Sequence, residues 1–226
     1  MRDDLALPLL VWLSPAFPVG AFAYSHGLEW AHEAGDVHNL ESAREWIADL
    51  VSYGSGRNDA ILLASSWRAT RERDFAALKE IIELSLALQP SSERYLESTM
   101  QGKAFLSTAR AAWSHGALDE ITQHVKTDLA YPVAVGLVAA AYDMPLPRVL
   151  DAFLLAFVSN VVSACVRLGA IGQTDGQRVI AALLPLIRRE AENAETATLD
   201  DIGSSVFRSD LASLQHETQY TRLFRS

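Results

Sequence analysis

Residues 131–170 read YPVAVGLVAAAYDMPLPRVLDAFLLAFVSNVVSACVRLGA, and this stretch decides the fold class of the chain. Two segments within it, 133–142 and 149–166, are hydrophobic on nearly every face that a helix would have. A small globular protein can bury such helices only at its centre or beneath a partner. The uncharged run 152–166 is shorter than the roughly 20 apolar residues that cross a bilayer. We therefore predict a buried core helix there.

Elsewhere apolar residues recur at helical spacing and almost never alternate as in a half-buried strand. One apolar stripe follows Asn39, a residue type that caps helix N-termini, and consists of Ala43, Trp46, Ile47, Leu50 and Val51. Pro132 and Pro147 lie where a first helical turn tolerates proline. We predict further helices at 21–34, 59–71, 75–88, 92–113, 117–127, 132–143, 147–168, 175–194 and 209–221.

No linker rich in Gly, Ser or Pro and no internal repeat divides the chain. The prediction is therefore an all-α fold, with a single compact multi-helix domain of about ten helices over residues 1–226.

Composition excludes several classes of protein. The chain has 226 residues, of which 50% are hydrophobic and 21% charged, as in ordinary globular proteins. Its formal net charge of −9 has the wrong sign for neutralising phosphates, which disfavours a DNA or RNA partner. The single cysteine, Cys165, excludes an internal disulfide and a cysteine-based zinc site. A reducing compartment fits best.

The uncharged stretch 5–25 superficially matches a secretory signal peptide. Signal peptides begin with a positive region, whereas residues 1–4 carry no net positive side-chain charge. Pro8, Pro15, Pro18 and Gly20 would also interrupt a membrane-spanning helix. We predict that this segment is not an export signal.

Motifs for common chemistry are absent from the sequence. It contains neither a P-loop for nucleotide phosphates nor a G-x-S-x-G nucleophile elbow. Its six histidines include no H-E-x-x-H and no i, i+4 pair, the helical spacing that directs two imidazoles at one metal. We predict no catalytic residues, no resident metal and no cofactor, although a weak metal site shared across a dimer remains open.

Three segments are unusual for a plain helical core. Residues 14–29 combine prolines, glycines and aromatics, either as a rigid turn or as a partner-binding surface. Residues 167–177 end one helix and begin another. At the end of the first helix, Arg167 would complement the helix dipole and a glycine would form the C-cap, and Thr174 or Asp175 would cap the start of the next helix. Gln173 and Gln177 are less easily explained by capping and could contact another protein.

The third segment is the C-terminal stretch 209–226. It begins as an amphipathic helix with Leu211 and Leu214 on its apolar face. It then becomes a tail that carries Tyr220, Leu223 and Phe224 among arginines. Such a tail is too apolar for a solvated chain end, and folding on a partner would explain it.

Together these segments resemble the UreF family of urease accessory proteins. The resemblance rests on LLVWLSPAFPVGAFAYSHGLE at 9–29, RLGAIGQTDGQ at 167–177 and HETQYTRLFRS at 216–226, three motifs in the family's order. Ala23 and Thr221 stand where the family is associated with serine. The resemblance implies an all-α, cytoplasmic homodimer that is not itself an enzyme and acts in nickel insertion into urease. Its implied partners are UreD (also called UreH), the GTPase UreG and the urease apoprotein.

We predict that the partner-binding residues lie in the same three segments, with 216–226 as an arm that orders against UreD. They are Ser14, Pro15, Phe17, Pro18, Gly20, Tyr24, His26, Glu29, Arg167, Gly169, Gly172, Gln173, Gln177, Glu217, Gln219, Tyr220, Arg222, Leu223, Phe224 and Arg225.

Two alternatives to a scaffold remain open. In one, Arg167 or Gln173 acts on a nucleotide held by UreG, which would make the chain a GTPase activator. In the other, the chain is a small helical enzyme that uses Tyr24, His26 and Glu29 as acid and base groups, because an i, i+3 spacing would place His26 and Glu29 on one helix face.

Overall fold

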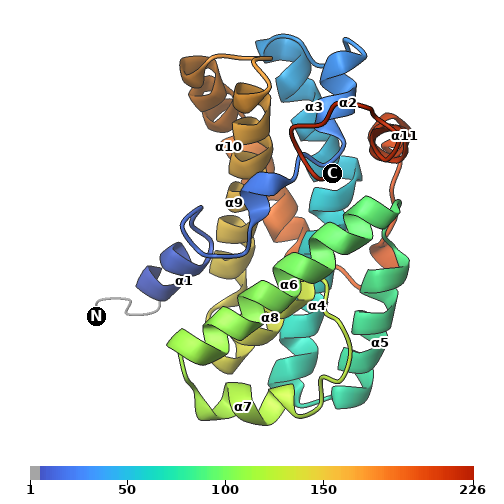
Figure 1. The fold of residues 1–226 in the computed structure, drawn as a ribbon. Coiled ribbons are helices and arrows are strands. Elements are labelled where there is room, and N and C mark those ends of the chain that lie inside the picture. Colours follow the sequence, from blue (N-terminus) through green and yellow to red (C-terminus); the bar gives the residue numbers. More distant parts are fainter. Residues whose placement is uncertain (1–5) are drawn as a thin grey trace.

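The fold consists of α-helices packed against one another (Figure 1). The computed structural model describes residues 6–226, and no strand occurs in that range. Its α-helices are α1 (Ala6–Trp12), α2 (Leu28–Glu33), α3 (Leu40–Tyr53), α4 (Ser55–Glu72), α5 (Phe75–Ala87), α6 (Ser92–Ala112), α7 (Gly116–Thr122), α8 (Tyr131–Ala141), α9 (Leu146–Arg167), α10 (Gln173–Thr196) and α11 (Phe207–His216). Two short 3-10 helices, η1 (Ala21–Ala23) and η2 (Leu199–Asp201), join them. The prediction of one compact all-α domain is confirmed.

The central helix is α8, which is buried on every face. Every residue of α8 after Tyr131 is buried, and its neighbours include α4 and α6. The Ser66 hydroxyl of α4 donates a hydrogen bond of 3.0 Å to the carbonyl oxygen of Val133. The sequence left open whether the apolar helices are central or covered by a partner. The structure shows that α8 is buried within the chain itself.

Helix α9 is the one described helix long and apolar enough to cross a membrane by length and composition. Its side chains pack instead against α10 and α4, and its buried residues include Leu150, Leu154 and Cys165. The prediction of a buried core helix is therefore confirmed. Burial also raises the pKa of the Cys165 thiol to about 12, so this cysteine packs as a small hydrophobe.

Several predicted helix ends are confirmed by their capping geometry. The Asn39 side chain accepts a hydrogen bond of 2.9 Å from the Ser42 amide and begins α3. Pro132 and Pro147 lie in the first turns of α8 and α9. Gly169 has a φ of 79° and follows α9, where its amide and that of Ala170 satisfy carbonyls of the last turn.

Five helix positions differ from the prediction. Residues 21–34 form η1 and α2 rather than one helix, because Gly27 has a φ of 74° and its α-carbon packs against the backbone of Ser213. A methyl group added there would lie 2.7 Å from the Ser213 amide nitrogen. Helix α7 ends at Thr122 and α11 at His216, both earlier than predicted, and α1 was not predicted. Helix α10 begins after Gly172, so neither Thr174 nor Asp175 is its cap.

Helix α1 lies within the stretch 5–25 that superficially matches a secretory signal peptide. Leu9 and Trp12 are buried in the core, and Trp12 makes edge-to-face contacts with the rings of Phe105, Trp113 and Tyr142. The charge argument concerned residues 1–4, which lie outside the described residues.

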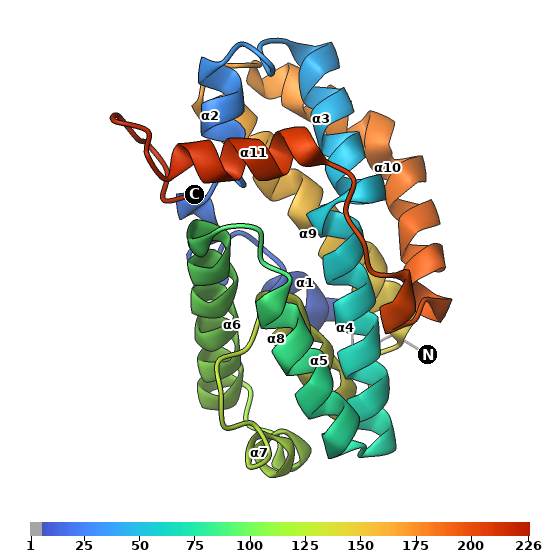
Figure 2. The same ribbon diagram turned by 90° about the vertical axis from the view of Figure 1, so that its right-hand side faces the viewer.

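Figure 2 shows how the C-terminal end of the chain is placed. Helix α11 crosses one end of the molecule in front of α2 and α3, and the tail after it turns back toward α2 and the start of α6. Residues distant in sequence thereby meet at one junction.

Candidate partner-binding site

The three segments singled out in the sequence meet at the C-terminal tail. The Ser226 carbonyl oxygen accepts a hydrogen bond of 2.7 Å from the Ser25 amide, and the Arg225 amide donates one of 2.8 Å to Ala23. The guanidinium of Arg167 lies 4.1 Å from the centre of the Phe224 ring, and it also donates to the carbonyl oxygen of Phe22. The tail thus joins segment 14–29 to the end of α9.

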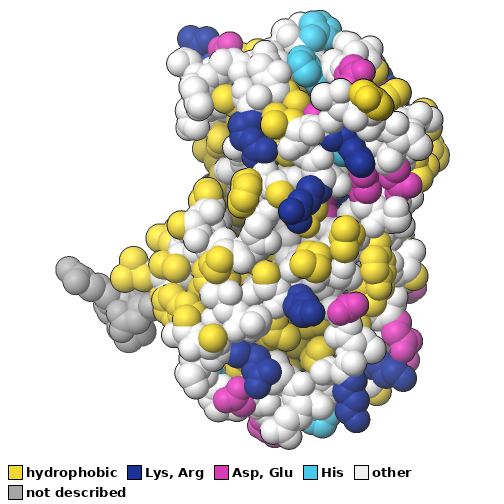
Figure 3. All heavy atoms as spheres, in the orientation of Figure 1, with side chains coloured by type: hydrophobic (Ala, Val, Ile, Leu, Met, Phe, Trp, Pro, Cys, Tyr) yellow, Lys and Arg dark blue, Asp and Glu magenta, His cyan; other side chains and the backbone are white. Residues whose placement is uncertain are grey.

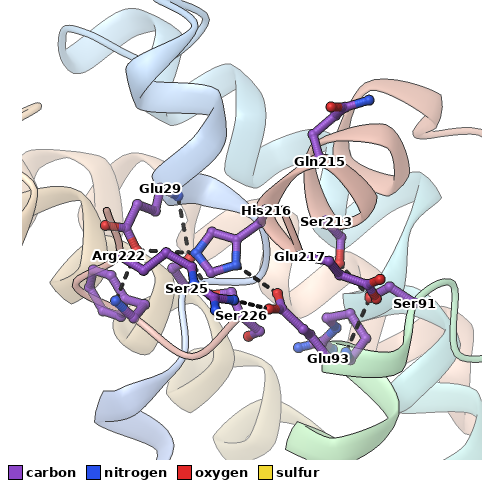
Figure 4. A network of polar contacts seen from close by, with 12 residues as sticks. Ser25, Glu29, Ser91, Glu93, Ser213, Gln215, His216, Glu217, Arg222 and Ser226 are labelled. Atoms are coloured by element: carbon purple, nitrogen blue, oxygen red, sulfur yellow. Dashed lines mark hydrogen bonds and ion pairs between the residues drawn. The ribbon is translucent and has the colours of Figure 1, made fainter. Parts of the chain in front are cut away.

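Glu29 on α2 holds the tail by its backbone. Its carboxylate accepts hydrogen bonds of 2.6 Å from the Leu223 amide and 2.9 Å from the Phe224 amide. The same carboxylate lies 3.2 Å from Nε2 of His216, whose Nδ1 is 2.6 Å from Glu93. Figure 4 shows the His216 ring between the two carboxylates. Each ring nitrogen therefore lies at hydrogen-bond distance from a carboxylate oxygen.

A second buried charge cluster lies beside the first. Glu97 on α6 pairs with Arg94, accepts a hydrogen bond of 2.7 Å from the Ser226 hydroxyl, and lies 3.3 Å from Nε2 of His26. Burial, with help from Arg94, lowers the pKa of His26 to about 4, so His26 is neutral at pH 7. Burial alone would raise the pKa of Glu97, but Arg94, His26 and the Ser226 hydroxyl together lower it.

Asp59 on α4 is half-buried near this cluster and supplies a pH-dependent prediction. Burial is the main cause that raises its pKa from 3.8 to about 7; Arg94 opposes the rise and Glu97 adds to it. The folded chain therefore holds this proton more tightly than the unfolded chain, and stability is lost as the pH rises from about 4 to about 7.

Asp59→Asn removes the ionisation. We expect the variant to gain unfolding free energy relative to the natural chain as the pH rises from 4.5 to 8, measured by urea denaturation. Asp151→Asn, at an exposed position of α9, controls for the loss of one charge. An equal difference between Asp59→Asn and the natural chain at both pH values would contradict the prediction.

The predicted site residues divide into three groups by exposure. The buried residues pack against other parts of the same chain; they are Phe17, Tyr24, His26, Glu29, Gln219 and Phe224. Ser14, Gly20 and Glu217 are half-buried. The exposed ones are Pro15, Pro18, Arg167, Gly169, Gly172, Gln173, Gln177, Tyr220, Arg222, Leu223 and Arg225. The predicted arm is thus already docked on its own chain, with one side of it left open.

One local expectation about these residues is wrong. The i, i+3 argument assumed that His26 and Glu29 share a helix, but His26 has a φ of 58° and lies before α2 begins. The two side chains bind different partners, Glu97 and His216. The glycine C-cap expected in 167–177 is Gly169, which has a positive φ; the φ of Gly172 is −82°, and a methyl group there would meet open space.

The apolar face of α11 also differs from expectation. Its inward residues are Ala212, Ser213 and His216. Leu211 and Leu214 point outward with 56% and 47% of their surface exposed, and Phe207 is 77% exposed. These three residues at spacings of four and three form one stripe along the helix. Tyr220 and Leu223 extend the exposed apolar surface onto the tail.

Sequence reasoning missed the charged residues that hold the junction together, among them Glu93, Arg94 and Glu97 of α6. Their spacing of one and three residues in a first helical turn is ordinary. The hydrogen bond of 2.7 Å between the Ser91 and Ser213 hydroxyls, and that of 2.8 Å from the Ser92 amide to Glu217, also join positions distant in sequence. Within residues 6–226 no group of three His, Cys, Asp or Glu side chains is arranged to hold a metal ion.

Comparison with known proteins points to one family. A family model described as UreF matches residues 37–184. A protein of Rhodopseudomonas palustris named "Urease accessory protein UreF" is 53% identical over 218 residues, which cover 96% of this chain and 92% of that protein. Proteins of the same name from Azorhizobium caulinodans and Xanthobacter autotrophicus are 51% and 54% identical, covering 98% and 97% of this chain and 95% and 90% of their own lengths.

Proposed function

Because this chain belongs to the UreF family, we propose that it acts in urease maturation as a non-catalytic scaffold for nickel insertion. In this proposal it binds UreD (UreH), recruits the GTPase UreG, and brings both to the urease apoprotein in the cytoplasm. The relatives are named accessory proteins, and the prediction that the chain is not an enzyme is confirmed.

One observation carries the scaffold proposal: α11 and the docked tail present large apolar side chains to solvent. Tyr220 is completely exposed and Leu223 is 62% exposed, although the neighbouring Phe224 is buried. A docked tail holds these side chains in place, so a partner would pay little ordering entropy to bind them. Exposed aromatic and aliphatic anchors of this kind are typical centres of protein interfaces. We assign this surface, consisting of Phe207, Leu211, Leu214, Tyr220 and Leu223, to UreD.

The homodimer is part of the same proposal. Helix α1 leaves an apolar face uncovered, with Leu7 70%, Leu10 65% and Val11 45% exposed. Figure 3 shows hydrophobic side chains gathered over α1, at the left of that view. Such a face favours contact with a second copy of the chain.

The test is a double substitution on the exposed side of the tail, Tyr220→Ala with Leu223→Ala. Both side chains are exposed, so we expect the helical circular dichroism to be unchanged while copurification with UreD falls at least tenfold. Leu184→Ala, at a position of α10 that is 48% exposed, is the matched control and should bind normally. Wild-type recovery of UreD by the double variant would overturn the assignment.

A further inference from the structure

A groove lies between α3 and the start of α11, at the end of α11 opposite the tail. Its volume is about 420 Å³. One wall is a single face of α3, formed at helical spacing by Glu45, Trp46, Asp49 and Tyr53. The other wall is Asp36 and the first residues of α11, including Phe207. The linker before α11 is tied to α3 by a hydrogen bond of 3.0 Å from the Ser205 amide to the Tyr53 carbonyl oxygen, so the two walls are fixed relative to each other.

The groove is acidic. Asp36, Glu45 and Asp49 line it, and the one cation in its lining, Arg208, is hydrogen-bonded to Asp36. Glu45 and Asp49 are exposed, and neither has a Lys or Arg nitrogen within ion-pair distance among the described residues. Neither carboxylate makes an ion pair within residues 6–226. Arg44, which is paired with Glu41, offsets only part of the charge of Glu45, so the field of the groove favours a cationic ligand.

Aromatic rings border the same carboxylates. Trp46 is largely buried in the α3 wall, whereas Tyr53 and Phe207 are 57% and 77% exposed. Ring faces attract guanidinium and ammonium groups, and they also cover the aliphatic stems of Arg and Lys side chains. A metal ion would interact with the carboxylates alone, and an apolar ligand would interact with the rings alone. A basic side chain uses both.

We propose that this groove binds a basic segment of a partner protein, whose Arg or Lys head groups pair with Glu45 and Asp49 while their stems lie on Tyr53 and Phe207. The groove lies apart from the apolar surface assigned to UreD except for Phe207, which borders both. The site and its ligand class are defined by this chain alone, so the inference does not depend on which accessory protein supplies the segment.

The test uses a blocked, fluorescein-labelled peptide of eight alternating arginines and leucines, with binding followed by fluorescence anisotropy. We expect Glu45→Gln with Asp49→Asn to raise the Kd at least tenfold. Phe207→Ala should raise it three- to tenfold, as expected for loss of one cation–π contact. A peptide with glutamate in place of arginine should not bind.

The matched control is Glu80→Gln with Glu83→Gln, which removes two exposed carboxylates from α5 and changes the net charge by the same amount. We expect less than a twofold change in its Kd. An equal loss of affinity in both pairs would show that the peptide responds only to the overall charge of −9, and would overturn the proposal. Absence of binding to the natural chain at millimolar peptide would overturn it as well. Neither result bears on UreD copurification, which tests the scaffold separately.

Discussion

Glu29→Ala should destabilise the chain by about 3–5 kcal/mol, the cost typical of removing one partner from a buried charge pair. The substitution leaves the amides of Leu223 and Phe224 without an acceptor and exposes Nε2 of His216 to a cavity instead of a carboxylate. An unfilled buried donor costs about 1–3 kcal/mol. Equilibrium unfolding in guanidinium chloride measures the loss, and amide hydrogen exchange at Leu223 and Phe224 should show the tail undocking first.

Two further variants separate the causes. Glu29→Gln keeps an acceptor for the tail amides but loses the charge beside His216, so its destabilisation should fall between those of the natural chain and Glu29→Ala. Glu192→Ala, at an exposed position of α10, should change stability by no more than about 0.5 kcal/mol. If Glu29→Ala unfolds at the same midpoint as the natural chain, the carboxylate does not hold the tail.

The same contacts change what truncation of the chain would do. The sequence predicted residues 216–226 as an arm that orders against UreD. In the structure, deletion of 219–226 would remove the contacts that the tail makes with Glu29, Glu97 and Arg167. A truncated chain that fails to bind UreD would therefore confound loss of contact with loss of stability, whereas substitutions of Tyr220 and Leu223 do not.

The elements predicted well from the sequence are those whose signals are local. Asn39 and the apolar stripe after it fixed the start of α3, and proline in a first turn fixed α8 and α9. The break at Gly27 has a distant cause, since the backbone of Ser213 packs against that glycine. The outward face of α11 is also a tertiary outcome, because His216 turns inward to meet Glu29 and Glu93 and so sends Leu211 and Leu214 to solvent.

The three segments predicted to bind partners meet in the structure, but the chemistry of their junction was not predictable from the sequence. A motif identifies which residues belong together and not which of them face solvent. Phe224 and Tyr220 are both aromatic tail residues, yet one is buried under Arg167 and the other is completely exposed. That difference is set by Glu29, whose carboxylate fixes the tail backbone and hence the direction of each side chain.

Arg167 decides between a scaffold and a GTPase activator, and its contacts favour the scaffold. An arginine finger must extend into a partner's nucleotide site, where it is worth 10³–10⁵ in kcat. The Arg167 guanidinium instead lies over the Phe224 ring and donates to the Phe22 carbonyl oxygen. We expect Arg167→Ala to weaken tail docking and assembly with UreG, and to lower urease activation in proportion, while the GTPase rate of each assembled complex stays unchanged.

Gln173→Ala and Arg167→Lys complete this test. Gln173 is exposed at the start of α10, so its substitution should reduce assembly through lost contact without affecting the tail. Lysine keeps the charge of Arg167 but loses the planar group that stacks on Phe224, so Arg167→Lys should assemble only partly better than Arg167→Ala. The measurements are recovery of UreG in the complex and single-turnover GTP hydrolysis by that complex. A fall in hydrolysis of a thousandfold or more in fully assembled Arg167→Ala complexes would establish the activator instead, because no loss of tail docking changes the rate of a complex that has already formed.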